Sequence, residues 1–177
     1  SYTICRLHIS LILNIMQKVA ELKKHFPYKG KVEWIGVRSF QGSAVEQKSF
    51  INALTDHGLD GDKAGQRHGG KRQVTLIQAE YIDVIRSLMP EANLNLTDLR
   101  RNIAISGINL NALKDCTIQV GQAKLEITGF CHPCGKLEAQ LGQGVFNALR
   151  GHGGLTAKVT DGGLIQVGDE IQVLTAG

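Results

Sequence analysis

The stretch CTIQVGQAKLEITGFCHPCGKLEAQ, residues 116–140, contains the clearest pattern in the chain. Apolar and polar residues alternate over 117–120 and again over 123–130, and a period of two is typical of a half-buried strand. The two runs meet at Gly121 and Gln122, a pair that fits a two-residue turn with glycine first. The sequence therefore predicts a β-hairpin, and two cysteines follow it closely.

Further short strands are predicted on both sides of the hairpin. Alternating or β-branched runs bounded by turn residues predict strands, and apolar residues at helical spacing predict helices. Many short strands with a few helices favour a mainly β, barrel-like domain over a doubly wound α/β fold. The predicted strands are 31–39, 73–77, 100–106 and three within 155–174; 43–53 is a strand or an extended arm, and the predicted helices are 14–25, 78–89 and 136–149.

In two of these segments the spacing predicts which side chains share a face. In strand 31–39, Val32 and Trp34 are expected on one side, and Ile35 and Val37 on the other. In helix 78–89, the apolar face is expected to consist of Tyr81, Val84, Ile85 and Leu88.

Length and composition are those of a single globular domain. The chain has 177 residues, of which 42% are hydrophobic and 20% charged. No apolar run is long enough to cross a bilayer, so no membrane partner is expected. Met16 reads as a natural start, so residues 1–15 are predicted to be a leader or appended segment and residues 16–177 a single domain. Leaving out Cys5, an odd number of cysteines remains, which favours a reducing, cytoplasmic setting.

The net charge of +4 is mild. It allows an anionic ligand, but the lysines and arginines do not form a continuous basic stripe. Aromatic residues, which a base-stacking surface would need, make up only 5% of the chain. We therefore expect a small-molecule substrate and no nucleic-acid partner.

The pair Cys131 and Cys134 has several interpretations. In thioredoxin-like proteins a dithiol pair opens a long helix, but the helix expected here is interrupted by glycines. A zinc ribbon needs a second pair of ligands at the right spacing, and the sequence has none. Burial of both cysteines as small hydrophobic residues is the plain alternative. Pro133 and Gly135 place Cys134 at a strand-to-helix corner, which favours an exposed, functional thiol.

A glycine-rich loop, 55–72, combines backbone freedom with positive charge. Its glycines allow backbone N–H groups to turn toward a ligand, and its basic side chains suit a phosphate or another oxyanion. A surface loop with solvated charges is an equally good interpretation of this segment alone. The candidate anion-binding residues are Arg67, His68, Gly69, Lys71 and Arg72.

Two further segments offer basic residues. RGHGG, residues 150–154, echoes RHGG at 67–70, and the two could meet at one anion; a capping or hairpin role explains the glycines more simply. In LRRNI, residues 99–103, Arg100 and Arg101 are expected on opposite faces of a strand, so that one is solvated and the other meets a ligand. The candidates from these segments are Arg101, Asn102, Arg150, His152 and Gly153.

Taken in order, four segments resemble the MOSC domain family, which is named for the C-terminal domain of molybdenum cofactor sulfurase. They cover most of the chain past residue 55, and the ordered set is specific although each piece alone is weak. The resemblance implies a β-rich barrel with a few peripheral helices. The segments are GLDGDKAGQRHGGKRQVTLIQAE (58–80), LRRNIAISGINLNALKDCTIQVGQAKLEITG (99–129), HPCGKL (132–137) and GGLTAKVTDGGLIQVGDEIQVL (153–174).

The resemblance also implies a chemistry. Cys134, in PCGKL, corresponds to the functional thiol of the family and would bind the metal of molybdenum cofactor, whose phosphate suits the Arg- and Gly-rich loops. The implied activity is reduction of N-hydroxylated compounds with electrons from a separate donor protein. The alternatives are a sulfur carrier that holds a persulfide on Cys134, supplied by a sulfur donor protein, and a Cys131/Cys134 dithiol redox protein. Cys131 departs from the single-thiol pattern, because a neighbouring thiol could convert a persulfide to a disulfide.

Overall fold

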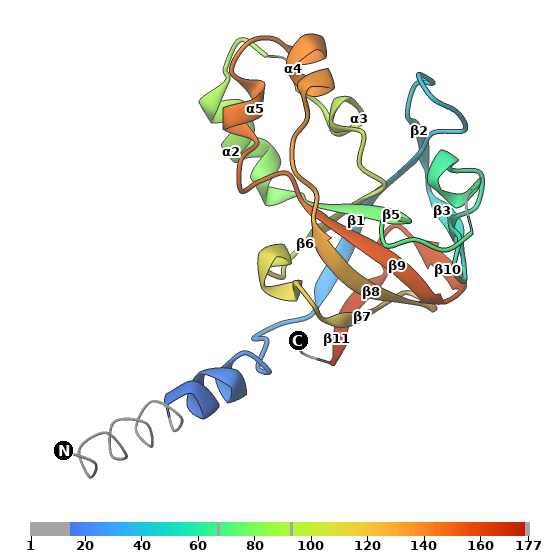
Figure 1. Cartoon of the computed structure of the whole chain (residues 1–177), viewed down its shortest axis with the longest axis vertical. Coiled ribbons are helices and arrows are strands. Elements are labelled where there is room, and N and C mark those ends of the chain that lie inside the picture. The colour runs from blue at the N-terminus through green and yellow to red at the C-terminus, as the bar shows by residue number, and fades with distance from the viewer. Residues whose placement is uncertain (1–14, 67, 93, 176–177) are drawn as a thin grey trace, which may run out of the picture.

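Seven of the described strands close into a barrel. The computed structural model describes residues 15–66, 68–92 and 94–175. Its strands pair in the order β11-β7-β8-β9-β5-β6-β1, and antiparallel pairing of β1 with β11 closes the ring (Figure 1). The predicted mainly β, barrel-like fold is confirmed. The strands are β1 (Gly30–Val37), β2 (Glu46–Lys48), β3 (Phe50–Leu54), β4 (Gly58–Leu59), β5 (Val74–Gln78), β6 (Ile103–Ser106), β7 (Thr117–Val120), β8 (Ala123–Phe130), β9 (Leu155–Asp161), β10 (Gly163–Gln166) and β11 (Glu170–Thr175).

The hairpin β7–β8 forms where the alternation predicts it. Val120 pairs with Ala123, and the two residues between them make the turn, with Gly121 at φ 55°. Along β8, Leu125 and Ile127 point into the barrel and are almost fully buried. The strand then leads to the two cysteines, so the hairpin fixes where that segment leaves the barrel.

Strand β1 contains a bulge that changes which residues share a face. Its pairing with β6 shifts register between Val32 and Trp34. As a result Val32 lies in the barrel core together with Ile35 and Val37, while Trp34 belongs to a second apolar cluster outside the barrel. The prediction that Val32 and Trp34 share a side is therefore wrong.

The second cluster is covered by the helices at one end of the barrel (Figure 1). Helix α2 buries Ile82 and Ile85, whereas Val84 is 40% exposed and Leu88 58% exposed. The predicted face of α2 is thus largely wrong, because the helix is rotated so that Ile82, Ile85 and Met89 face the cluster. The short helices are η1 (Lys63–Gln66), α2 (Glu80–Leu88), α3 (Leu96–Leu99), η2 (Leu110–Leu113), α4 (Gly135–Leu141) and α5 (Val145–Ala148).

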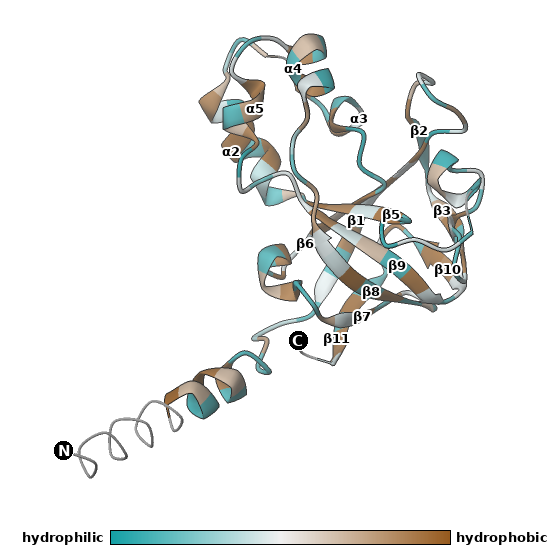
Figure 2. Ribbon diagram, in the orientation of Figure 1, coloured by the Kyte–Doolittle hydropathy of each residue, from teal (hydrophilic) through white to brown (hydrophobic). Residues whose placement is uncertain are grey.

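A helix over residues 15–22 points away from the barrel, at the end opposite α4 (Figure 1). Its apolar side chains are exposed, among them Met16 at 63% and Leu22 at 70%, and they alternate with charged ones (Figure 2). Residues 1–14, which make up most of the predicted leader and include Cys5, lie outside the described part of the chain. No helix in the described part is long and apolar enough to span a bilayer.

Candidate functional site

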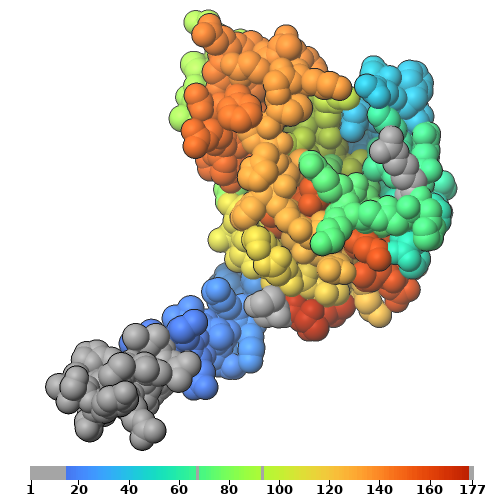
Figure 3. Space-filling model, in the orientation of Figure 1, coloured from blue at the N-terminus to red at the C-terminus, as the bar shows by residue number. Residues whose placement is uncertain are grey.

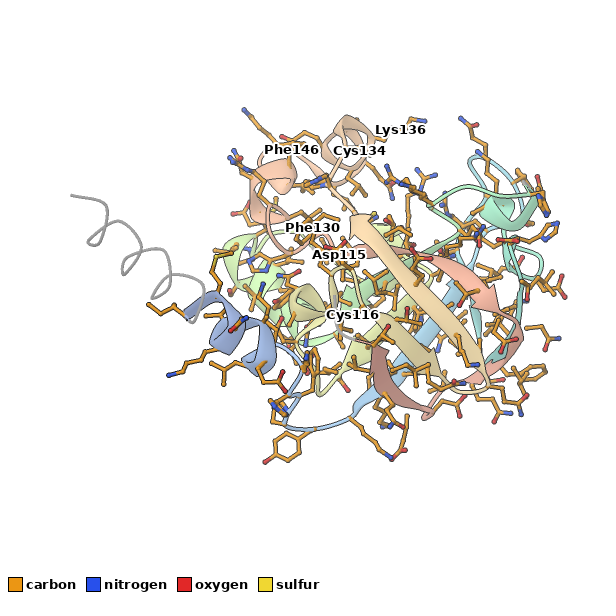
Figure 4. All side chains as sticks on the ribbon, turned by 60° about the horizontal axis from the view of Figure 1, so that its bottom comes forward. Asp115, Cys116, Phe130, Cys134, Lys136 and Phe146 are labelled. Carbon is orange, nitrogen blue, oxygen red and sulfur yellow. The ribbon has the colours of Figure 1, made fainter. Side chains whose placement is uncertain are left out.

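Cys134 lies at a strand-to-helix corner, as the sequence predicts. The chain leaves β8 at Phe130, runs through four residues without regular structure, and enters α4 at Gly135. Cys134 is the N-cap of α4, with extended backbone angles (φ −133°, ψ 161°), and it is exposed. Figure 4 shows it at one end of the molecule together with Lys136 and Phe146, far from Cys116 in the barrel core.

The surroundings of Cys134 favour the thiolate. Partial burial on its own would raise the pKa of the thiol, but hydrogen bonds from the backbone N–H groups of Leu137 and Lys136 lower it. The positive charges of Arg101 and Arg100 lower it further. The pKa of Cys134 is therefore held below its ordinary value, and Cys134 is the more reactive of the two neighbouring cysteines by exposure as well.

Cys131 has a different environment from Cys134. It is only 5% exposed, and its backbone N–H donates to Gly154 O at 2.8 Å, which extends the β8–β9 pairing. Its Sγ lies 3.9 Å from Nη2 of Arg72. Both cysteines are free thiols. Cys131 thus anchors the segment that presents Cys134.

Arg101 holds this segment in place from beneath. It is 7% exposed and precedes β6 rather than lying within a strand, as the sequence predicts. Its Nε donates to Gly153 O at 2.8 Å, its Nη1 to Leu99 O at 2.8 Å and its Nη2 to Cys131 O at 3.5 Å. Burial lowers the pKa of Arg101, and the two nearby thiols oppose that shift. Arg101 therefore positions the cysteine segment and adds positive charge beside it.

Two arginines that we did not select from the sequence complete a basic cluster. Arg38 directly follows β1, and Arg100 ends α3 in the left-handed conformation with φ 57°. Burial, together with repulsion from Arg100 and Arg101, lowers the pKa of Arg38, and Asp62 opposes the shift. Arg38 could have been suspected from its place at a strand end. The position of Arg100 could not, because a strand was predicted there.

Asn102 supports this cluster from within. Its Oδ1 accepts from the N–H and hydroxyl of Thr75, and its Nδ2 donates to Gly36 O and Asp62 Oδ1. Asp62 in turn accepts from the N–H of Arg38 at 2.9 Å. The amide of Asn102 is thus fully engaged inside the protein, where it orients Asp62 beneath the arginines.

Two pockets lie beside the cluster, and Figure 3 shows the hollow between α4, the segment before β2 and the green loop of residues 63–72. The cationic pocket has a volume of about 540 Å³ and the Arg100 pocket about 490 Å³. Two larger clefts, of about 630 and 610 Å³, lie near helix 15–22 and between α2 and α5, and neither is lined by Cys134 or the arginines. The cationic pocket is lined by Arg38, Lys63, Gly69, Lys71, Arg72 and Gln73, and the Arg100 pocket by residues 42–45, Thr97, Asp98, Arg100 and Gln140.

The other predicted anion-binding residues lie in different places. Lys71, Arg72 and Gly69 line the cationic pocket, whereas His68 packs edge-on against His57 with ring centroids 4.9 Å apart. Arg67 lies outside the described residues.

The 150–154 segment does not meet the other loop at either pocket. Arg150 and His152 line neither of them. The ring of His152 contacts Tyr81 at 4.7 Å, and its buried Nδ1 has no hydrogen-bond partner among the described residues. Gly153 supplies the carbonyl that accepts from Arg101, so its role in the site is through the backbone.

The arrangement combines a reactive thiol with a place for an anion. A thiolate binds soft metals and also takes up sulfur. The described residues contain no group of three or more His, Cys, Asp or Glu side chains that could hold a metal ion. Cys134 is therefore a single protein ligand with a cationic pocket close by.

Fold and site together define a class of protein, a β-barrel domain that presents one exposed cysteine beside several arginines. A profile of the MOSC domain matches residues 64–172, and the chain belongs to the MOSC domain family. The matched region contains Cys134 and the arginines at 72, 100 and 101. MOSC domains are associated in general with molybdenum cofactor binding. A search of curated protein sequences gives no significant match.

Solved structures share the fold. The YuaD protein of Bacillus subtilis is 20% identical with a TM-score of 0.70, over 84% of this chain and 98% of that one. YiiM of Escherichia coli is 18% identical with a TM-score of 0.66, over 85% and 72% of the two chains. YiiM of Geobacillus stearothermophilus is 13% identical with a TM-score of 0.65, over 82% and 75%. At these identities the likeness concerns the fold alone.

Proposed function

We propose that the protein binds molybdenum cofactor through Cys134 and reduces N-hydroxylated compounds, with electrons from a separate donor protein. The observation that carries this proposal is the exposed, low-pKa thiol of Cys134 beside the arginine cluster. Membership of the MOSC domain family supports the cofactor.

The residues present fit the cofactor. One soft thiolate suits a metal that brings its other ligands from a pterin dithiolene. The cofactor ends in a phosphate, and none of the described residues that line the cationic pocket is acidic. Arg38, Lys63, Lys71 and Arg72 would hold this phosphate, in line with the preference of Arg and Lys for such groups.

When bound, the cofactor supplies two-electron chemistry. Cys134 holds the metal at the corner before α4, and Arg101 keeps the corner in place through Cys131 O and Gly153 O. Reduction of an amidoxime consumes two electrons and two protons, breaks the N–O bond, and yields an amidine and water. The donor protein delivers the electrons, and solvent supplies the protons at this exposed site.

The activity is tested with protein purified from cofactor-competent cells, an aryl amidoxime and a reduced viologen dye as electron source. We expect turnover in the wild type and a loss of about 100-fold or more in Cys134→Ser, because a metal ligand is removed. Cys131→Ser is the matched control and retains activity. Turnover in Cys134→Ser equal to wild type would contradict the proposal.

A sulfur carrier is the second candidate, since the same exposed thiolate could hold a persulfide delivered by a sulfur donor protein. This function predicts an added sulfur atom on Cys134 that a reductant removes. Intact-protein mass spectrometry of wild type and Cys134→Ser, made with a cysteine desulfurase, distinguishes it from cofactor binding.

A further inference from the structure

The Arg100 pocket lies on the other side of the arginine cluster from the cationic pocket, and nothing in the proposed function yet occupies it. One wall carries Gln140 of α4, the helix that Cys134 caps, and another carries Thr97, Asp98 and Arg100 at the end of α3. The charge of Arg100 acts on the Cys134 thiol. The pocket of about 490 Å³ therefore opens close to the reactive sulfur.

Arg100 is free to bind a ligand. Among the described residues, no hydrogen bond or ion pair to its guanidinium is found, although three other charged groups of the site respond to its charge: Arg38, Arg101 and Cys134. The left-handed backbone at φ 57° fixes where its side chain leaves the chain. A half-buried arginine without a carboxylate partner is suited to bidentate binding of a ligand carboxylate.

The two pockets differ in charge, and this difference assigns their ligands. The cationic pocket gathers four basic side chains and suits a doubly charged phosphate. The Arg100 pocket also contains Asp98, whose Oδ2 accepts from the N–H of Asn95 at 2.8 Å. One arginine beside one carboxylate disfavours a dianion and tolerates a monoanion with polar atoms, which Thr97 and Gln140 can bind.

We propose that the Arg100 pocket is the substrate subsite and that it selects N-hydroxylated compounds carrying a carboxylate. This inference rests on the proposed function, because it takes the N–O group to lie toward Cys134 and the carboxylate toward Arg100.

The test compares two probes that differ only in charge, benzamidoxime and 4-carboxybenzamidoxime. Isothermal titration calorimetry measures their binding to wild type, Arg100→Asn, Arg72→Gln and Lys124→Gln. Asn is chosen because it tolerates the left-handed conformation at position 100, and Lys124, at the start of β8 far from Cys134, is the control for loss of one surface charge.

We expect wild type to bind the carboxylate probe about 10-fold or more tightly than the neutral probe, the effect of one charged hydrogen-bonded pair. Arg100→Asn abolishes the preference, whereas Arg72→Gln and Lys124→Gln keep it, and Arg100→Lys keeps part of it. Equal affinities in wild type, or loss of the preference in Arg72→Gln rather than in Arg100→Asn, would overturn the inference.

Kinetics on the loaded protein separates this inference from the function on which it rests. Arg100→Asn is expected to raise KM for the carboxylate probe with little change in kcat, and to leave molybdenum content unchanged. A loss of molybdenum in Arg100→Asn would assign the residue to the cofactor and overturn the inference. Failure of the proposed function would show instead as wild-type protein without molybdenum, while the calorimetric comparison still decides which ligand the pocket prefers.

Discussion

At the scale of single residues, the chemistry depends on how the chain treats two cysteines that lie three positions apart. Cys134 is exposed at the start of α4, while Cys131 is buried against Arg72. The sequence allowed the choice of Cys134, because Pro133 and Gly135 predict a corner there. It did not give the positions of Arg38 and Arg100, since their contribution comes from contacts between segments far apart in the chain.

The lowered pKa of Cys134 predicts how its alkylation depends on pH. A thiol with a depressed pKa forms thiolate at lower pH, so the rate of reaction with iodoacetamide should rise at lower pH than for the same chain in urea. Arg100→Asn removes a positive charge that lowers the pKa and should move the midpoint upward. Peptide mass mapping identifies the labelled cysteine. A Cys134 midpoint at or above that of the unfolded chain would contradict the assignment.

At the scale of elements, alternation predicted nearly every strand, but departures from regular geometry were not readable. The bulge in β1 reverses the face of Trp34, and helix α2 turns by about one residue to bury Ile82. Neither follows from periodicity, because both depend on the element packed alongside. The glycines of segment 150–154 have a third such role. A Cβ on Gly153 would lie 2.3 Å from Cys131 O, and one on Gly154 would lie 1.9 Å from Leu76 O.

These close approaches predict that Gly153→Ala and Gly154→Ala destabilise the fold. The clashes are with backbone oxygens, and Gly154 also has φ 93°, so we expect a loss of about 1–3 kcal/mol for each variant. Gly135→Ala is the matched control, because its Cβ would meet nothing within 4 Å. Urea unfolding at equilibrium measures all three. Wild-type stability in Gly153→Ala and Gly154→Ala would refute the packing role.

The corner between α4 and α5 predicts a dependence of stability on pH. Glu138 accepts hydrogen bonds from Phe146 N at 2.6 Å and Gly144 N at 2.7 Å, which lower its pKa. A carboxylate with a depressed pKa stabilises the fold above its unfolded pKa of about 4.3, and this stability is lost as pH falls through its folded pKa. Glu138→Gln should therefore lower Tm at pH 7, and the difference from wild type should shrink in acid. Thermal unfolding monitored by circular dichroism checks this, with Glu91→Gln, a surface carboxylate, as control. A difference that does not change with pH would contradict it.

At the scale of the whole molecule, the barrel brings four separate parts of the chain to one end: Arg38 after β1, loop 63–72, the end of α3 and the corner at Cys134. The order of motifs predicted the family and the barrel, which the MOSC domain match and the fold confirm. Which loops meet at a pocket could not be predicted, because that depends on strand order around the barrel. The single domain predicted for 16–177 and the leader predicted for 1–15 stay predictions.

The measurement that tests the central claim most directly is molybdenum and pterin content, by elemental analysis and fluorescence of the oxidised pterin. It is made on wild type, Cys131→Ser and Cys134→Ser from cofactor-competent cells. We predict near-stoichiometric metal and pterin in wild type and Cys131→Ser and their loss in Cys134→Ser. Neither metal nor pterin in wild type, or full content in Cys134→Ser, would contradict the assignment of Cys134 as the ligand of a molybdenum centre.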